Sequence, residues 1–148
     1  MTEEQYITAL KNNPHGVRNI PNPTEEMQLV CVEQNGMLLQ YIKNPTDRVI
    51  ETALAQSPRA IQYVDNPSDE LLISLVKQDW AVLEYIQHPS DDVVRIALDQ
   101  SGWAIRYITN PSEELQLRAV ETQYDALQYI ANPSERVQMA AEIGRAHV

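Results

Sequence analysis

The stretch Asn110-Pro111-Ser112-Glu113-Glu114-Leu115 begins a segment that recurs along the whole chain. An Asn-Pro or His-Pro pair followed by Ser or Thr returns every 22 residues, with no insertion or deletion. The pairs are Asn22-Pro23, Asn44-Pro45, Asn66-Pro67, His88-Pro89, Asn110-Pro111 and Asn132-Pro133. Self-similarity at a constant period of this size indicates a repeat architecture.

The repeats cover the chain. Residues 1–21 fit the register as an opening repeat, complete repeats begin at residues 22, 44, 66, 88 and 110, and a partial repeat begins at residue 132. We therefore predict a single domain, residues 1–148, with repeats starting near residues 1, 22, 44, 66, 88, 110 and 132. Residues 12–21 depart from the pattern, and residues 144–148 leave it and are expected to fray.

The first half of each repeat has the signals of an α-helix. Numbering from the Asn as position 1, position 3 is always Ser or Thr, which are preferred N-cap residues. Positions 4 and 5 are nearly always acidic, which complements the positive end of the helix dipole. Apolar residues at positions 6, 10 and 11, such as Leu115, Ala119 and Val120, share one helical face. These signals predict a helix of about ten residues.

The second half predicts another short helix, over positions 15 to 21, with apolar residues at positions 17, 18 and 21, such as Ala126, Leu127 and Ile130. Position 14 is a second candidate cap, occupied by Asn, Ser or Asp except at Gln123. The next Asn-Pro pair ends this helix, because a residue that precedes proline is disfavoured in the helical region. Helices this short are not stable alone and must bury their apolar sides against neighbours. The predicted fold is an all-α solenoid of two-helix repeats.

The charge composition disfavours some classes of binding partner. The chain has 21 acidic and 11 basic side chains and a formal charge of −10, which disfavours nucleic acid and anionic membranes and would suit a basic protein partner. We see no secretory signal and no apolar run long enough to span a membrane, so we expect a cytoplasmic protein. The single cysteine, Cys31, occupies an apolar position and is predicted to lie in the core.

The sequence offers no catalytic constellation. His15, His88 and His147 fall at unrelated positions of the repeat, and no acidic residue stands at ligand spacing from them. A Gly-rich phosphate loop and a nucleophile elbow are also missing. We predict a protein that is not an enzyme and that uses no metal or cofactor.

Two repeated columns are predicted to be structural. The asparagines are interpreted as a stacked ladder at the turns, where they satisfy backbone groups. The tyrosines at position 20 are interpreted as packing residues whose hydroxyls reach backbone groups, with a row of ligand contacts as the alternative. The tyrosine column comprises Tyr41, Tyr63, Tyr85, Tyr107 and Tyr129.

The acidic positions form a third column, which would run along one edge of a solenoid. Helix-dipole compensation and solubility explain it without a ligand. The alternative is a negative ridge that enters a basic groove, as a mimic of a phosphate backbone. Arg48 and Arg136 interrupt the column. The candidate ridge is Glu25, Glu26, Asp47, Asp69, Glu70, Asp91, Asp92, Glu113 and Glu114.

The positions that differ most between repeats, 15, 16 and 19, are the best candidates for binding a partner. Both tryptophans lie there, in consecutive repeats, and Trp, Tyr and Arg are enriched at interface hot spots. The alternative is that these rings cover the gap left by the short second helix. The candidate partner-binding residues are Trp80, Trp103, Tyr124, Arg59, Arg106, Met37 and Glu84.

The junction Tyr107-Ile108-Thr109-Asn110-Pro111-Ser112 and its copies resemble the leucine-rich repeat variant family. The run from Val32 to Tyr41 is also similar to a bacterial repeat domain of unknown function. The resemblance implies a HEAT-like, right-handed solenoid in which an α-helix alternates with a short 3₁₀-like helix. The period here is shorter, and the cysteine cluster that can precede such repeats is missing, so no iron–sulfur cofactor is expected. Some HEAT-like solenoids are DNA glycosylases with a basic face, a role that the acidic balance disfavours.

These observations predict a non-enzymatic protein–protein interaction module, such as a bacterial or phage adaptor or inhibitor. The alternative is an acidic decoy that blocks the groove of a nucleic-acid-binding protein. Self-association through the aromatic residues also remains open at this stage.

Overall fold

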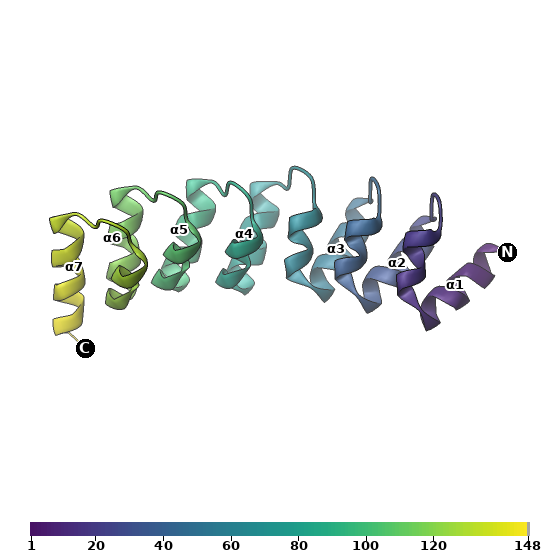
Figure 1. Ribbon diagram of the computed structural model, residues 1–148, viewed down its shortest axis with the longest axis horizontal. Helices are drawn as coiled ribbons and strands as arrows, with labels where there is room; N and C mark the ends of the chain where they lie inside the picture. Colours follow the sequence, from purple (N-terminus) through teal and green to yellow (C-terminus); the bar gives the residue numbers. More distant parts are fainter. Residues whose placement is uncertain (148) are drawn as a thin grey trace. The chain divides into compact units, whose positions relative to one another are not determined.

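The computed structural model describes residues 1–147, and these are all-helical, with thirteen helices and no strand (Figure 1). Contacts divide the chain into two compact units, Met1–Asn66 and Pro67–Val148, which are described separately. In each unit an α-helix alternates with a 3₁₀-helix, labelled η. No helix among the described residues is both long and apolar enough to cross a membrane.

The helix bounds follow the sequence period. In the first unit they are α1 (Glu3–Asn12), η1 (Pro14–Asn19), α2 (Glu25–Gln34), η2 (Gly36–Tyr41), α3 (Asp47–Gln56) and η3 (Pro58–Tyr63). In the second unit they are α4 (Asp69–Gln78), η4 (Trp80–Tyr85), α5 (Asp91–Gln100), η5 (Gly102–Tyr107), α6 (Glu113–Thr122), η6 (Tyr124–Tyr129) and α7 (Glu135–Ala146). Within each unit, successive α-helices pack on one another and so do successive 3₁₀-helices.

The capping of the α-helices is as predicted. At every α-helix the hydroxyl of position 3 accepts a hydrogen bond from the backbone N–H three residues later, as Ser112 does from Leu115. Thr2 and Gln5 extend this to a reciprocal capping box at the start of α1. Six of the seven α-helices have ten residues, the length expected from the sequence, and α7 has twelve.

The second helix of each repeat ends one residue earlier than the predicted position 21, and it has the 3₁₀ form that the resemblance implied. It is a 3₁₀-helix of six residues that ends at position 20, and the residue at position 21 is extended, as in Ile108 with φ −102° and ψ 125°. A 3₁₀-helix rises about 2.0 Å per residue against about 1.5 Å in an α-helix. Six residues are therefore longer along the helix axis as a 3₁₀-helix than as an α-helix.

The second cap was only partly predicted. Asn35 and Asp79 accept hydrogen bonds from the backbone N–H two residues later. No side-chain cap forms at Asn13, Ser57, Ser101 or Gln123. The buried Ser101 hydroxyl instead donates to Gln123 Oε1 of the next repeat, at 2.7 Å, so this position serves packing between repeats.

The two irregular ends also adopt the pattern. The departing residues 12–21 still form η1, whose Val17 is buried in a core with Leu10, Met27, Cys31 and Leu38. The predicted fraying is wrong for residues 144–146, because α7 continues to Ala146. Gly144 lies against the Tyr124 side chain of η6, which supports this last turn. Residue 148, part of the same expectation, lies outside the described residues.

The backbone conformation, and not a ladder of side-chain hydrogen bonds, explains why asparagine recurs at position 1 of the repeats. Asn22, Asn44, Asn66, His88, Asn110 and Asn132 all have φ between 47° and 55°. Asparagine and histidine are among the few residues enriched in this left-handed region, which explains why His88 can replace asparagine. In residues 1–147 no hydrogen bond joins one of these side chains to the next, so the ladder interpretation is wrong.

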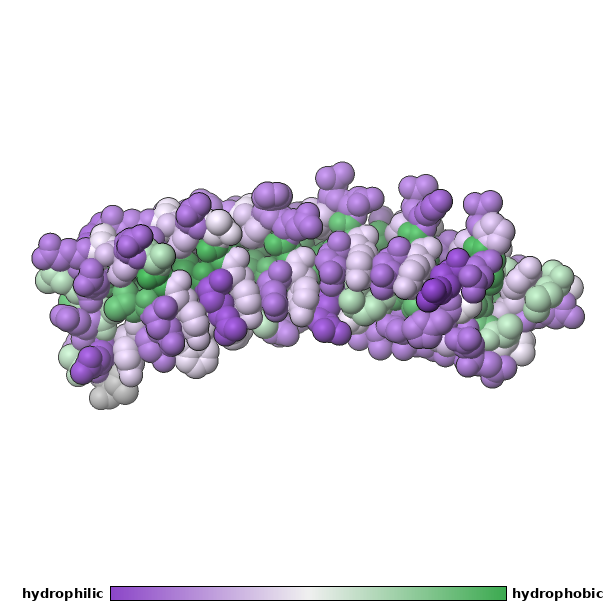
Figure 2. Space-filling view, in the orientation of Figure 1, coloured by the Kyte–Doolittle hydropathy of each residue, from purple (hydrophilic) through white to green (hydrophobic). Residues whose placement is uncertain are grey.

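The core consists of the apolar positions predicted from the period. In the repeat that begins at His88, Val93, Ala97, Leu98, Ala104 and Ile105 are all at most 2% exposed, whereas Ile108 at the predicted position 21 is only half-buried. The face shown in Figure 2 is largely hydrophilic, with hydrophobic residues visible between the polar side chains. Burial therefore depends on contacts between repeats, as expected for helices too short to fold alone.

Glycine at position 15 has a packing role. A Cβ built on Gly102 would collide with the backbone carbonyl of Ala119 in α6, and one on Gly36 would collide with the carbonyl of Ala53 in α3. Both glycines are buried. The expectation that position 15 is free to vary for a partner is therefore wrong at these two residues.

We predict that Gly102→Ala lowers the free energy of unfolding by about 1–3 kcal/mol, the usual cost of overpacking against backbone that cannot move freely. Gly16→Ala is the control, because its added methyl group would meet only the Leu10 side chain, at an ordinary 3.5 Å. Urea unfolding curves measure both. Equal stability of the two variants would contradict the packing role.

We also predict that Asn110→Val costs about 1–2 kcal/mol of stability, because a β-branched residue is strained at φ 51°. Asn110→His should stay close to the unaltered protein, since His88 already adopts this conformation. The same unfolding measurement compares them. If both variants lost equal stability, the side chain and not the backbone would be responsible.

Candidate functional site

The 3₁₀-helices of the second unit bring aromatic and arginine side chains together. The rings of Trp80 in η4 and Tyr107 in η5 have centroids 6.4 Å apart and an interplanar angle of 35°. The guanidinium carbon of Arg106 lies 5.2 Å from the Tyr107 ring centroid and 5.3 Å from that of Tyr129 in η6. We call Trp80, Tyr107, Arg106 and Tyr129 the aromatic–arginine row.

Trp103 lies on the same side of η5 as Arg106, because residues three apart nearly eclipse each other in a 3₁₀-helix. It is 38% exposed, and its indole Nε1 donates a 2.8 Å hydrogen bond to Asp125 Oδ1 in η6. Since the indole N–H is bound to the next repeat, the ring is held in one orientation while part of it remains in solvent. Such an ordered, exposed ring loses little conformational entropy when a partner covers it.

The row arises where the chain departs from its own repeat. At position 19, three repeats carry glutamine, and each glutamine donates to the backbone carbonyl three residues earlier: Gln40 to Met37, Gln62 to Arg59 and Gln128 to Asp125. Arginine replaces glutamine at Arg106 and lies over the tyrosines instead. Arg18 in the first unit does the same, 5.5 Å from the Tyr41 centroid.

The structure brings together only part of the predicted site. Trp103 and Arg106 share η5, and Trp80 reaches them through Tyr107. Glu84 is exposed on η4, while Tyr124 is half-buried against Gly144 at the other end of the unit.

Two predicted residues belong to the first unit. Met37 is half-buried on η2 and Arg59 is exposed on η3. Because the units are described separately, these residues are not assigned to the row. The gap-filling interpretation fits Tyr124 better than Trp103.

The sequence analysis missed Asp125 as a candidate, and for Tyr107 and Tyr129 it kept ligand contacts only as the alternative to packing. The tyrosine column was interpreted as packing, yet Tyr41 and Tyr129 are 41% and 39% exposed. In the part of the chain that the structure describes, the hydroxyls of Tyr41, Tyr107 and Tyr129 make no hydrogen bond to the backbone. A usable signal was present, because an arginine at position 19 precedes a tyrosine by 23 residues at both Arg18–Tyr41 and Arg106–Tyr129.

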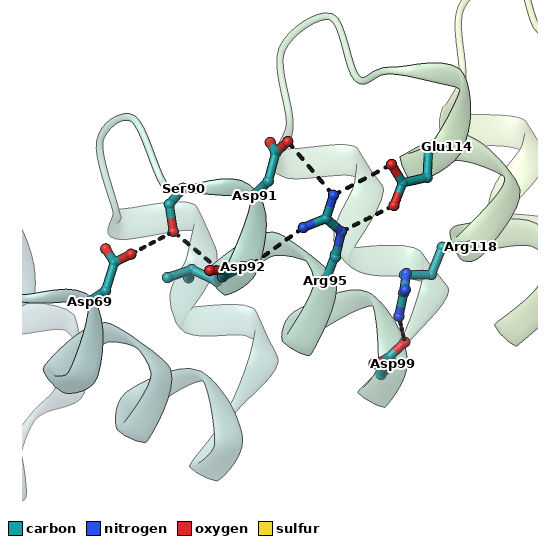
Figure 3. A network of polar contacts seen from close by, with 9 residues as sticks. Asp69, Ser90, Asp91, Asp92, Arg95, Asp99, Glu114 and Arg118 are labelled. Carbon is teal, nitrogen blue, oxygen red and sulfur yellow. Dashed lines mark hydrogen bonds and ion pairs between the residues drawn. The ribbon is translucent and has the colours of Figure 1, made fainter.

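The acidic column carries its own counter-charges. Figure 3 shows Arg95 of α5 between Asp91, Asp92 and Glu114, with Arg95 Nε 3.1 Å from Glu114 Oε1. The hydrogen bond to Glu114, reinforced by its charge, raises the pKa of Arg95 above the usual arginine value. Arginine therefore connects successive helices along this column.

The same pairing occurs at other acidic positions. Arg136 lies 3.6 Å from Glu113, and Arg48 lies 3.4 Å from Glu25 and 3.8 Å from Glu26. Asp69 accepts a 2.9 Å hydrogen bond from the Ser90 hydroxyl (Figure 3). Asp47 and Glu70 have no ion pair among residues 1–147. Arg48 and Arg136, which interrupt the column in the sequence, neutralise part of it in the structure.

A groove between two turns adjoins the row. It is lined by Ile86, His88, Tyr107, Asn110 and Leu115 among others, so Tyr107 belongs both to the groove and to the row. No group of three or more His, Cys, Asp or Glu side chains among the described residues is arranged to hold a metal ion.

Comparison with protein-family models, with curated proteins and with solved structures found no match to this chain.

Cys31 lies fully buried in the core of the first unit, as predicted. Burial raises the pKa of its thiol from 9.0 to about 11. The folded state keeps a proton that the unfolded state releases above about pH 9, so Cys31 adds no pH dependence below that value. Its contribution to stability falls as pH rises from about 9 to about 11.

We predict that Cys31 resists alkylation at pH 8 in the folded protein, at least about a hundredfold relative to protein unfolded in urea, because two pKa units reduce the thiolate fraction by that factor. The control is the double variant Cys31→Ala/Ala55→Cys, which moves the thiol to an exposed position on α3. Mass spectrometry of the labelled protein measures both. Rapid labelling of native Cys31 would contradict its placement in the core.

Proposed function

We propose that this chain is a non-enzymatic protein-binding module whose contact surface centres on Trp103 and the aromatic–arginine row. The observation that carries the proposal is the exposed Trp103 ring, held by Asp125, on the same side of η5 as Arg106. Trp, Tyr and Arg are the residues that dominate binding energy at protein interfaces. Here they are ordered before a partner arrives, which reduces the entropic cost of association.

The arrangement of the helices also supports an inference about the architecture of the chain. We infer a single-domain, right-handed α-solenoid of 22-residue repeats, similar to the leucine-rich repeat variant and HEAT-like proteins. In support, α2 to α7 begin at residues 25, 47, 69, 91, 113 and 135, a constant step of 22. The alternation of an α-helix with a 3₁₀-helix also agrees with that resemblance.

A bacterial or phage adaptor or inhibitor, acting in the cytoplasm, is the role that we propose for such a module. Glu84, which is exposed on η4, extends the surface within the second unit. Met37, Arg59 and Tyr124 are secondary candidates, since Met37 and Tyr124 are half-buried and Arg59 belongs to the first unit.

The acidic decoy is the alternative, and the ion pairs weigh against it. A mimic of a phosphate backbone needs carboxylates that are available to a basic groove. Arg48, Arg95 and Arg136 instead occupy carboxylates at the N-termini of α2, α5 and α6. We therefore place the decoy second.

The test is affinity capture from a bacterial lysate with the unaltered chain, Trp103→Ala and Glu113→Gln/Glu114→Gln, each at low and high salt. We expect a partner that survives high salt and whose affinity falls about thirtyfold or more with Trp103→Ala, the effect of removing a hot-spot residue. Met139→Ala is the matched control, because it also removes an exposed apolar side chain, 56% exposed, away from the row.

Two results would contradict the proposal. A partner lost with salt or with the glutamate variant, and retained by Trp103→Ala, would identify the acidic column as the site. If neither Trp103→Ala nor the glutamate variant altered the capture of a partner, this surface would have no support as a binding site.

A further inference from the structure

Arg106 differs from most other arginines of the second unit in having no acidic partner among the described residues. Arg95, Arg118 and Arg136 each lie within ion-pair distance of a carboxylate, and the Arg118 guanidinium is 2.7 Å from Asp99. Among residues 1–147, no carboxylate lies at that distance from Arg106. The chain has 21 acidic and 11 basic side chains, so the missing partner does not come from a shortage of carboxylates.

The guanidinium is nevertheless held in place. It lies over the rings of Tyr107 and Tyr129, at 5.2 and 5.3 Å, so a π face supports it from each of two successive 3₁₀-helices. No N–H of Arg106 donates to an acceptor in the described residues, and the side chain is exposed. The N–H donors of Arg106 are thus held in place and have no acceptor among the described residues.

A planar fork of N–H donors matches the two oxygens of a carboxylate and binds it through parallel hydrogen bonds. Fixing the fork in advance lowers the entropy lost on binding. The net charge of −10 repels an acidic partner at long range. Screening limits this repulsion to about 8–10 Å at physiological salt, so recognition of a carboxylate here acts at short range.

We propose that Arg106 is the residue that binds a carboxylate from an Asp or Glu side chain of the partner protein. Trp103, one 3₁₀ turn earlier, contacts an apolar residue beside that carboxylate. The inference rests on the proposed function and refines it: the partner presents an acidic side chain to this surface, even if it carries basic charge elsewhere.

The direct test follows the side-chain Nε–Hε signals of arginine by NMR in the full chain. The probe is the capped peptide Gly-Leu-Glu-Leu-Gly, compared with the same peptide carrying Gln and with inorganic phosphate. We expect the Arg106 signal to respond to the Glu peptide at about tenfold lower concentration than the signal of Arg145, an exposed arginine that has no ion pair among residues 1–147. Tyr129→Ala should reduce that difference, because it removes one supporting ring.

The inference is overturned if Arg106 responds no more readily than Arg145, if the Gln peptide acts equally, or if only phosphate binds. Identical titrations of the unaltered chain and Tyr129→Ala would likewise contradict the role of the tyrosines.

A second test separates this inference from the proposed function. Arg106→Gln introduces glutamine at position 19. Three other repeats already have glutamine there, at Gln40, Gln62 and Gln128, so we expect the fold to tolerate the change. Arg136→Gln removes the same charge at a distant helix and is the control. With a partner captured through Trp103, we expect about tenfold weaker binding for Arg106→Gln and little change for the control.

If Arg106→Gln left the affinity unchanged while Trp103→Ala abolished it, the carboxylate inference would fail and the binding module would stand. If neither variant affected capture, both would fail.

Discussion

The fold depends on one backbone conformation at every junction between repeats. The residue before each junction proline has φ between 47° and 55°, a region that most side chains avoid. Through this turn the chain leaves an extended residue after one 3₁₀-helix and reaches the N-cap of the next α-helix. Proline prevents the helix from starting early, and the Ser or Thr hydroxyl that follows satisfies an N–H of the new helix.

Short helices joined in this way have little stability of their own, so the contacts between repeats determine which residues are constrained. Gly102 and Gly36 are buried because a neighbouring carbonyl occupies the space of a side chain. Positions 16 and 19 are less constrained, and two residues of the candidate site, Trp103 and Arg106, are found there. Trp103 and Arg106 depart from the repeat at these two positions, and both contact the following repeat.

Charge is arranged differently on the two kinds of helix. On the α-helices, acidic residues complement the helix dipoles and also bind arginines, as Glu114 binds Arg95. Exposed pairs of this kind contribute little individually. On the 3₁₀-helices, Arg106 has no carboxylate partner within residues 1–147 and is supported by tyrosine rings. Arginine therefore connects repeats on the α-helices, and on η5 it presents N–H donors that have no acceptor among the described residues.

The sequence by itself determined the period, the α-helices with their caps, and the apolar positions of the core. These features depend on local chemistry repeated in register, so one repeat predicts the next. Tertiary structure decided what local chemistry leaves open. The residue after each six-residue helix is extended, as Ile108 is, and His88 replaces asparagine because it tolerates the same φ.

For the site, the sequence identified Trp103 and Arg106 as departures from the repeat but assigned Tyr107 and Tyr129 to packing. Only the structure placed Arg106 over both rings and Asp125 on the Trp103 indole. The physical reason is that the contacts of Arg106 with Tyr129 and of Trp103 with Asp125 join residues about one repeat apart, and their geometry follows from how successive 3₁₀-helices pack.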